Sequence, residues 1–218
     1  MEPKIPKKLQ QKLDDGRQYR RIDVAALETR DGEDGEKIVE GYAATFNQPY
    51  ELYAFDGYTV REQISPDAFR DADMADVIFQ YDHEGRVYAR TGNGTLTVTT
   101  DEHGLKIRAN LGGTESGRQL YEEIRGGYTT KMSFGFTVEK DERTVTENHD
   151  TGTVDVLRTI TGIRKLYDVS AVSLPANNAT EISARSYCDG VIAELTEERR
   201  KAEDRKRQIQ KIKILTTI

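Results

Sequence analysis

The sequence is poor in the residues from which covalent or metal-held frameworks are built. Cys188 is the only cysteine among 218 residues, which excludes an intramolecular disulfide framework and any zinc site made of several cysteines. No apolar run approaches the roughly 20 residues of a membrane span, and the first residues lack the apolar stretch of a secretion signal. We therefore expect a cytosolic chain with no membrane contact and no metal or cofactor.

Charge is unevenly distributed along the chain, whose formal net charge is −6. Residues 194–213 carry eight basic and five acidic side chains, so the rest of the chain is strongly acidic. An acidic body repels phosphate, and we expect no nucleic-acid partner. Only the basic tail could bind an acidic surface.

Apolar residues concentrate between positions 38 and 182, which predicts three parts. Residues 1–18 are expected to be a mobile basic arm, residues 19–189 a folded domain, and residues 190–218 a charged tail that is either helical or disordered. No internal repeat is present.

The central part shows mostly strand patterns. Residues 96–100 and 105–109 alternate with period two around a turn, which indicates a hairpin. A helix is predicted over 115–125, with Thr114 as its N-cap. Further elements are expected as strands at 22–27, 37–46, 77–81, 131–140, 154–163 and 167–174, and as a short helix at 65–69. The pattern predicts a mainly β (α+β) fold, a partly closed antiparallel β-barrel with a few covering helices.

Histidine is scarce, and one of the three stands out. His103 and His149 lie in polar turn sequences and are interpreted as solvated loop residues. His83 directly follows the apolar strand 77–81, at the point where the chain turns. It is either a general base or a structural loop residue.

Ser133 and Asp168 are the other candidates for chemistry. Ser133 opens a strand after a glycine-containing connection, and Gly135 would let another backbone or a substrate approach. Lys131 and the following strand distinguish this motif from the Gly-x-Ser-x-Gly elbow of α/β-hydrolases. Taken alone, Ser133 fits a nucleophile or an ordinary strand-edge serine.

Asp168 lies in the most apolar stretch of the chain, where a carboxylate needs a partner. Arg164 and His83 are the two candidates. Ser170 and Ser173 offer alternative hydroxyl groups, but their apolar neighbours favour core-strand serines.

Five blocks, in this order, resemble the motifs of the phage prohead proteases, which are relatives of the herpesvirus assemblins. The blocks are Glu40-Gly-Tyr-Ala-Ala-Thr-Phe46, Ile64-Ser-Pro-Asp-Ala-Phe69, Tyr81-Asp-His83, Met132-Ser133-Phe-Gly-Phe136 and Asp168-Val-Ser-Ala-Val-Ser-Leu-Pro-Ala-Asn177. The resemblance covers about residues 36–186.

The resemblance implies an assemblin-like serine protease with His83 as general base, Ser133 as nucleophile and Asp168 orienting the imidazole. The third member is a histidine in the assemblins, so the role of Asp168 departs from that pattern. An oxyanion site is required, and the backbone amides of residues 176–178 are the suggested donors.

The resemblance also implies a serine endopeptidase that cleaves the major capsid protein precursor, its scaffold segment and itself. It would act inside the assembling procapsid in the host cytoplasm, and association with a second copy is suggested. Residues 1–18 and 190–218 could be removed by self-cleavage.

Three alternatives stay open. The chain could be a catalytically inactive capsid-assembly or scaffold-associated β protein. An esterase or amidase for small molecules lacks an elbow motif and an evident apolar pocket. A metal hydrolase built on Asp82, His83, Glu84 and His149 lacks the His-Glu-x-x-His spacing.

Overall fold

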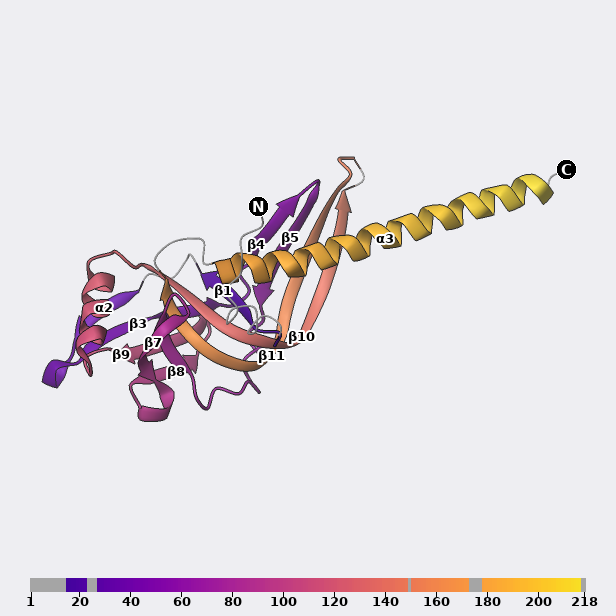
Figure 1. Cartoon of the computed structure of the whole chain (residues 1–218). Helices are drawn as coiled ribbons and strands as arrows, with labels where there is room; N and C mark the ends of the chain where they lie inside the picture. Colours follow the sequence, from indigo (N-terminus) through magenta and orange to yellow (C-terminus); the bar gives the residue numbers. More distant parts are fainter. Residues whose placement is uncertain (1–14, 23–26, 149, 173–177, 217–218) are drawn as a thin grey trace.

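The computed structural model describes residues 15–22, 27–148, 150–172 and 178–216, and their strands pair into two sheets (Figure 1). The larger sheet has the order β1-β10-β11-β5-β4, and β6 pairs with both β11 and β7. Its strands are β1 (Gln18–Ile22), β4 (Tyr50–Phe55), β5 (Tyr58–Ile64), β6 (Ile78–Tyr81), β7 (Glu84–Arg90), β10 (Lys131–Asn148) and β11 (Thr153–Val172).

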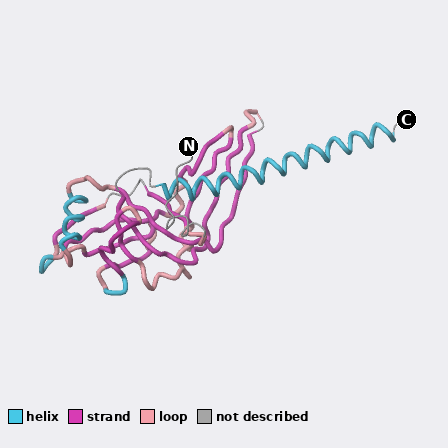
Figure 2. The backbone as a smooth tube through the Cα atoms, viewed as in Figure 1, coloured by secondary structure: helices cyan, strands magenta, loops and turns pink. Residues whose placement is uncertain are grey.

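The smaller sheet has the order β2-β3-β9-β8 and packs beside the first. It contains β2 (Glu28–Asp31), β3 (Lys37–Thr45), β8 (Leu96–Thr100) and β9 (Gly104–Asn110). The helices are α2 (Glu115–Arg125) and α3 (Asn178–Thr216), with 3₁₀ turns η1 (Glu33–Gly35) and η2 (Thr91–Asn93). Strands dominate the body and α3 leaves it as one long rod (Figure 2).

The expected mainly β architecture is confirmed, whereas a partly closed barrel is not supported. The described strands belong to two separate sheets, and neither pairing path returns to its first strand. β11 also pairs in parallel with β5 and β6, so the larger sheet is mixed rather than antiparallel. The short helix expected at 65–69 is instead a run of turns with backbone hydrogen bonds three residues apart, as in Ala68 to Ser65.

β10 and β11 are long, bent strands that carry the rest of the sheet. Two separate strands were expected at 154–163 and 167–174, but residues 153–172 form one strand, and residues 173–174 lie outside the described part. β10 extends eight residues beyond its expected end at residue 140. Their pairing shifts register between Gly135 and Asp141, and such bulges bend a strand. Figure 1 shows both strands as wide arcs. Residues 141–148 of β10 and 153–160 of β11, together with β4 and β5, form a projecting unit that we call the wing.

The bend brings β1 near β5, although β10 and β11 lie between them in pairing order. Arg20 of β1 donates to both carboxylate oxygens of Glu62 of β5, at 2.6 and 3.0 Å. Arg158 donates to the same carboxylate at 2.8 Å, and the Tyr50 hydroxyl donates at 2.6 Å. Burial opposes ionisation of Glu62, but the charges of Arg20 and Arg158 outweigh it and lower the pKa of this carboxyl. A buried ion cluster therefore ties the first strand to the centre of the sheet.

The hydrophobic core lies between the two sheets and packs against one face of β10 and β11. Phe134 and Phe136 of β10 stack with ring centroids 4.6 Å apart, and Phe69 packs against Phe134. α2 adds Leu120 and Ile124 at its buried face. The side chains on the opposite face of β10 are thereby held in a fixed register for chemistry.

α3 docks on the wing through its first half, and Arg199 adds an ion pair with Glu147 of β10. Cys188 and Val191 are buried there, and Leu195 packs against the same cluster. Arg143 of β10 pairs with Glu194. The helix runs without a break across position 190, so the boundary between domain and tail stays a prediction, as does the mobility of the arm, of which residues 1–14 lie outside the described part. In the described part of the chain, the helices contain no apolar stretch of membrane-spanning length.

Alkylation of Cys188 should be strongly suppressed in the folded chain. Burial raises the pKa of this thiol to about 11, which lowers the reactive thiolate fraction at pH 8 by about 100-fold relative to an ordinary cysteine. Iodoacetamide labelling followed by mass spectrometry measures the rate, with the urea-unfolded chain as the control. Equal rates in the folded and unfolded chains would mean that the first half of α3 does not stay docked.

Candidate active site

His83 sits in a two-residue turn that joins β6 to β7. Tyr81 and Glu84 pair across this turn, so Asp82 and His83 are its two central residues. Their φ angles are 49° and 60°, the left-handed values that a type I′ hairpin turn requires at both positions. Aspartate and histidine tolerate this region better than most non-glycine residues. The sequence therefore builds a tight turn that fixes the backbone beneath the imidazole.

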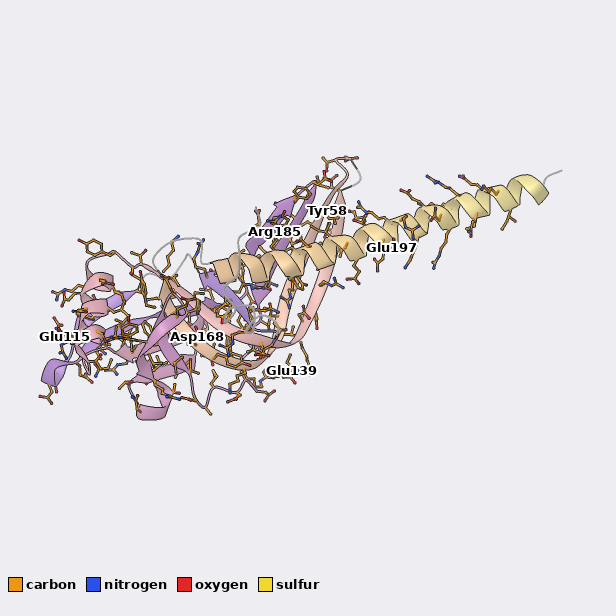
Figure 3. All side chains as sticks on the ribbon, viewed as in Figure 1. Tyr58, Glu115, Glu139, Asp168, Arg185 and Glu197 are labelled. Carbon is orange, nitrogen blue, oxygen red and sulfur yellow. The ribbon has the colours of Figure 1, made fainter. Side chains whose placement is uncertain are left out.

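β11 anchors this turn over the sheet. β6 pairs in parallel with the end of β11, and the backbone N–H of Asp82 donates to the carbonyl of Ala171 at 3.0 Å. The turn is thus joined to the strand that carries Asp168. Figure 3 labels Asp168 within the body of the molecule, far from the free end of α3.

Ser133 and Asp168 lie on neighbouring antiparallel strands and share one face of the sheet. Ser133 is paired with Ser170 and Gly135 with Asp168, and residues two apart on a strand point to the same side. The imidazole of His83 bridges the two side chains. Its Nε2 lies 2.6 Å from the Ser133 hydroxyl oxygen, and its Nδ1 is hydrogen-bonded to a carboxylate oxygen of Asp168. The three residues expected from the sequence therefore meet.

All three side chains are almost fully buried. Ser133 and Asp168 are each 1% exposed and His83 is 2% exposed. Low local dielectric strengthens hydrogen bonds among such groups and makes a missing partner costly. The arrangement is accordingly a tightly held hydroxyl–imidazole–carboxylate chain.

Ser170 is a fourth member that sequence reasoning missed. Its hydroxyl donates to the same oxygen of Asp168 at 3.2 Å and lies 3.2 Å from Nδ1 of His83. It was expected to be a core-strand serine, and it is indeed buried. The available signal was its spacing of two from Asp168, which places both side chains on one face of a strand.

Tyr19 of β1 closes the other side of the imidazole. Its ring meets that of His83 edge-on, with centroids 4.6 Å apart and planes at 62°. Burial, with the nearby Asp168 carboxylate, raises the pKa of Tyr19 to about 12. A neutral phenol ring therefore packs against the imidazole, directly after the segment expected to be a mobile arm.

Gly135 has a different role from the expected approach of a backbone or substrate. It stands between Tyr19 and Asp168 in a row across β1, β10 and β11. A Cβ at this position would collide with the Asp168 carboxylate and lie 2.8 Å from the Tyr19 ring. The missing side chain is the space into which the carboxylate fits.

Replacing Gly135 with alanine should damage the site far more than the fold. The added methyl would push the Asp168 carboxylate away from the imidazole, and a displacement near 1 Å lowers a catalytic rate by roughly 100-fold. Cleavage of a peptide substrate measures the loss, and circular dichroism monitors the fold. Gly113→Ala is a control in a surface turn, where no atom lies within 4 Å of the added carbon and the backbone is not left-handed. Full activity in Gly135→Ala would contradict this account.

The remaining candidates do not join this constellation. His103 lies exposed in the turn between β8 and β9, and Arg164 is also exposed. His149, Ser173 and residues 176–177 of the suggested oxyanion donors lie outside the described residues, and Asn178, the third of these donors, is the first residue of α3. Within the described ranges, no three potential metal-ligating side chains are gathered together.

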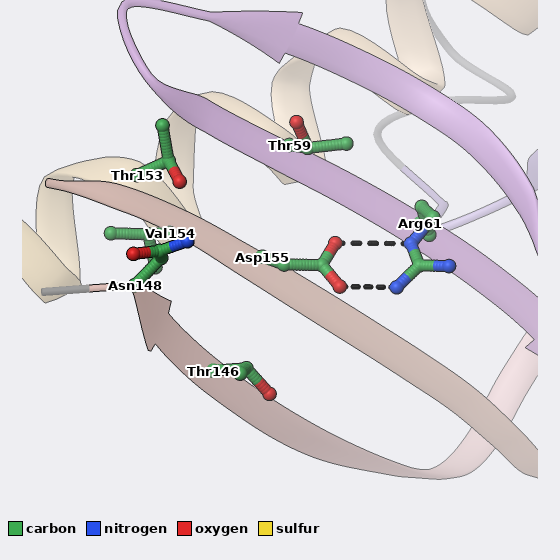
Figure 4. A pocket seen from close by; sticks show the side chains of 7 residues that line it. All are labelled: Thr59, Arg61, Thr146, Asn148, Thr153, Val154 and Asp155. Atoms are coloured by element: carbon green, nitrogen blue, oxygen red, sulfur yellow. Dashed lines mark hydrogen bonds and ion pairs between the residues drawn. The ribbon is translucent and has the colours of Figure 1, made fainter. Parts of the chain in front are cut away.

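A shallow pocket of about 360 Å³ lies on the wing and contains no member of the constellation (Figure 4). Arg61 and Asp155 form a two-pronged ion pair across it, as the dashed lines show. Because each side chain already satisfies the other, the pocket offers no unpaired charge to a ligand. It adds nothing to the chemistry of the buried site.

The geometry suits nucleophilic acyl transfer. A serine is activated when an adjacent base can take its proton and a third group orients that base. Asp168 at Nδ1 favours the tautomer with the proton on that nitrogen, which leaves Nε2 to accept the proton of Ser133.

Comparisons with known proteins agree with this chemistry. Residues 22–191 match the family model described as caudovirus prohead serine protease. The chain is 30% identical over 167 residues to the prohead protease of Enterobacteria phage HK97, in a match that covers 75% of this chain and 65% of that protein. The chain thus spans slightly less than two thirds of this curated relative.

A solved structure, that of the bacteriophage T4 capsid assembly protease, shows a weak likeness. The TM-score is 0.35 at 12% sequence identity, over 71% of this chain and 98% of the other. A likeness of this strength supports no argument about fold or mechanism.

Proposed function

The chain belongs to the caudovirus prohead serine protease family, and we propose that it is a serine endopeptidase that cleaves capsid-precursor and scaffold segments. The single observation that carries the proposal is the placement of the His83 imidazole between the Ser133 hydroxyl and the Asp168 carboxylate. The family match covers these three residues.

The proposed reaction proceeds through a covalent acyl-enzyme. His83 takes the proton of Ser133 at Nε2 while the serine oxygen attacks the carbonyl carbon of the scissile peptide bond. The protonated imidazole then gives this proton to the leaving amine as the carbon–nitrogen bond breaks. Water, deprotonated by the same imidazole, hydrolyses the ester and restores the serine.

Asp168 and Ser170 would act on the imidazole rather than on the substrate. The carboxylate fixes the tautomer of His83 and stabilises the positive charge that forms on the ring. Ser170 donates to that carboxylate and so limits its rotation. We regard Ser170 as a positioning residue.

The partners follow from the family and not from any contact in the chain itself. The proposed substrates are the major capsid protein precursor, its scaffold segment and the protease itself, inside the assembling procapsid in the host cytoplasm. Association with a second copy and removal of the ends by self-cleavage belong to the same proposal. The relation to the herpesvirus assemblins stays a prediction.

The test is incubation of the purified chain with its capsid precursor, followed by electrophoresis and mass spectrometry of the products. The proposal expects shortened precursor, with turnover unchanged by a strong chelator. Normal assembly of the precursor without any shortening would favour the inactive scaffold-associated protein. Hydrolysis of small esters without cleavage of any peptide would favour the esterase.

Asp168→Asn should lower the cleavage rate by about 10³–10⁴-fold and leave measurable residual activity. The amide keeps the shape but no longer enforces the productive tautomer or stabilises the imidazolium. Initial rates of peptide cleavage give the size of the loss. Asp76→Asn removes a carboxylate from an exposed ion pair with Arg90 and is the matched control. Equal rates for the two variants would remove Asp168 from the mechanism.

A further inference from the structure

Apolar side chains follow α3 from Ala184 to Ile212 at alternate spacings of four and three residues, interrupted by Glu198 and Arg205. Positions spaced alternately by four and three residues form one stripe on such a helix, the a and d positions of a heptad. In the docked half, this stripe consists of Ala184, Cys188, Val191 and Leu195. Cys188 and Val191 are buried against the wing, and Leu195 packs beside them.

The same stripe continues where the helix has left the body. Its next members are Glu198, Ala202, Arg205, Ile209 and Ile212. Ile209 is 53% exposed and Ile212 is 60% exposed. Figure 1 shows this half of α3 projecting beyond the wing, and Figure 3 shows its side chains reaching out into the surroundings. The stripe that docks against the wing thus continues on the projecting part through Ala202, Ile209 and Ile212, with Arg205 among them.

The flanks of the projecting stripe are basic. The e and g positions of these heptads include Lys201 and Lys206, and the spacing gives Lys213 the next e position. Arg199, at the preceding e position, already pairs with Glu147 of the wing. The acidic residues of this half, Glu203 and Asp204, fall on the outer face at b and c. Residues 201–216 contain six basic and two acidic residues in all.

This pattern selects the kind of helix that can lie on the stripe. In a coiled coil, the e and g side chains of one helix face those of the other, and opposite charges there decide which helices pair. A second copy would bring basic flanks against basic flanks in either orientation. An acidic helix would neutralise them, and an acidic side chain opposite Arg205 would fix the register.

We propose that residues 201–216 of α3 dock an acidic amphipathic helix of another protein as a short two-stranded coiled coil. The contact would span about 24 Å, since a helix rises about 1.5 Å per residue. Little more than two heptads bury a small area, so the association is weak and reversible for one pair of helices. The proposal uses neither Ser133 nor His83 and stands apart from the proposed peptidase activity.

The probe for this surface is a synthetic peptide of three heptads, about 21 residues, with leucine at a and d and glutamate at e and g. Fluorescence anisotropy with the full chain at low salt measures its dissociation constant. The expected result is saturable binding that a scrambled peptide of the same composition does not reproduce. Equal binding of the scrambled peptide would mean non-specific charge attraction and would overturn the proposal.

Paired variants test the stripe and its flanks separately. Lys206→Glu at an e position should weaken binding about 5-fold, whereas Arg207→Glu, with the same change of charge on the outer f position, should change it less than about 2-fold. Ile209→Gln should weaken binding at least ~10-fold, because it removes a buried apolar contact. Gln210→Ala, on the adjacent outer position, is its control.

Three results would assign the surface to something else. Equal losses in Lys206→Glu and Arg207→Glu would overturn the coiled-coil geometry. Dimerisation of the chain alone in sedimentation, abolished by Ile209→Gln, would make a second copy the occupant. Tighter binding of duplex DNA than of the acidic peptide, insensitive to Ile209→Gln, would make the helix a nucleic-acid contact.

Discussion

Ser133→Ala should lower the rate of peptide cleavage by about 10⁵-fold while leaving the fold unchanged. In a serine peptidase the whole covalent route depends on this one oxygen, and removing any central member of such a triad loses nearly the full chemical contribution. The substitution removes one buried hydroxyl whose partner is the His83 imidazole, so little packing is lost. The expected stability change is about 1 kcal/mol.

Ser170→Ala is the matched control for this experiment. It removes a buried hydroxyl that touches the same imidazole from the neighbouring strand. A positioning hydroxyl should affect the rate by only about 10-fold, since one hydrogen bond contributes about 1 kcal/mol. A fluorophosphonate probe followed by peptide mapping should label Ser133 in the wild type and in Ser170→Ala. Labelling of Ser170 in the Ser133→Ala variant, with undiminished cleavage, would exchange the two roles.

Glu62→Gln should lower the free energy of unfolding by about 3–5 kcal/mol. Breaking a buried ion pair leaves a charge without compensation, and here the charges of both Arg20 and Arg158 would lose their common anion. Natural domains are stable by only about 5–15 kcal/mol, so the change is a large fraction of the total. Urea unfolding followed by circular dichroism gives the value.

Asp155→Asn is the control on the same pair of strands. It breaks the ion pair with Arg61, which lies on the exposed face of the wing and should contribute less than about 1 kcal/mol. The pKa of Glu62 is lowered in the folded chain, so its contribution is present above the unfolded pKa and is lost as the pH falls through the folded value. Equal costs for the two substitutions at neutral pH would contradict the buried cluster.

The sequence pattern alone predicted the elements that are stabilised by contacts between residues close together in the chain. The hairpin of β8 and β9 alternates around a turn, and α2 begins at Thr114, whose hydroxyl accepts from the N–H of Gly117 at 3.0 Å. β4 and β7 were missed because polar and aromatic residues dominate them and at most one side chain in each is buried. β5 was missed because the charged Glu62 occupies one of its three buried positions. β4 and β7 pair with their chain neighbours β5 and β6 across two-residue turns, and only β5 also pairs with a distant strand, β11. The Asp56-Gly57 turn between β4 and β5 was therefore a local hairpin signal that was overlooked.

The residues of the candidate site likewise fall into those that the sequence predicts and those that it does not. His83, Ser133 and Asp168 could be predicted because each is a chemically unusual residue in its surroundings. Tyr19 and Ser170 are ordinary in sequence, and their roles appear only once β1, β10 and β11 are in register. The link between Arg20 and Glu62 was equally invisible, because it joins residues 42 positions apart and depends on the bend of the whole sheet.

The left-handed backbone angles of His83 lower the stability of its turn, whereas the side chain that they place is needed for the proposed activity. Glycine adopts such angles freely, whereas a non-glycine residue there carries strain of about 1 kcal/mol or more. A chain with glycine at this position would lose the proposed general base, but its turn would be free of this strain. The imidazole proposed as the general base is thus placed by a backbone conformation that destabilises the turn.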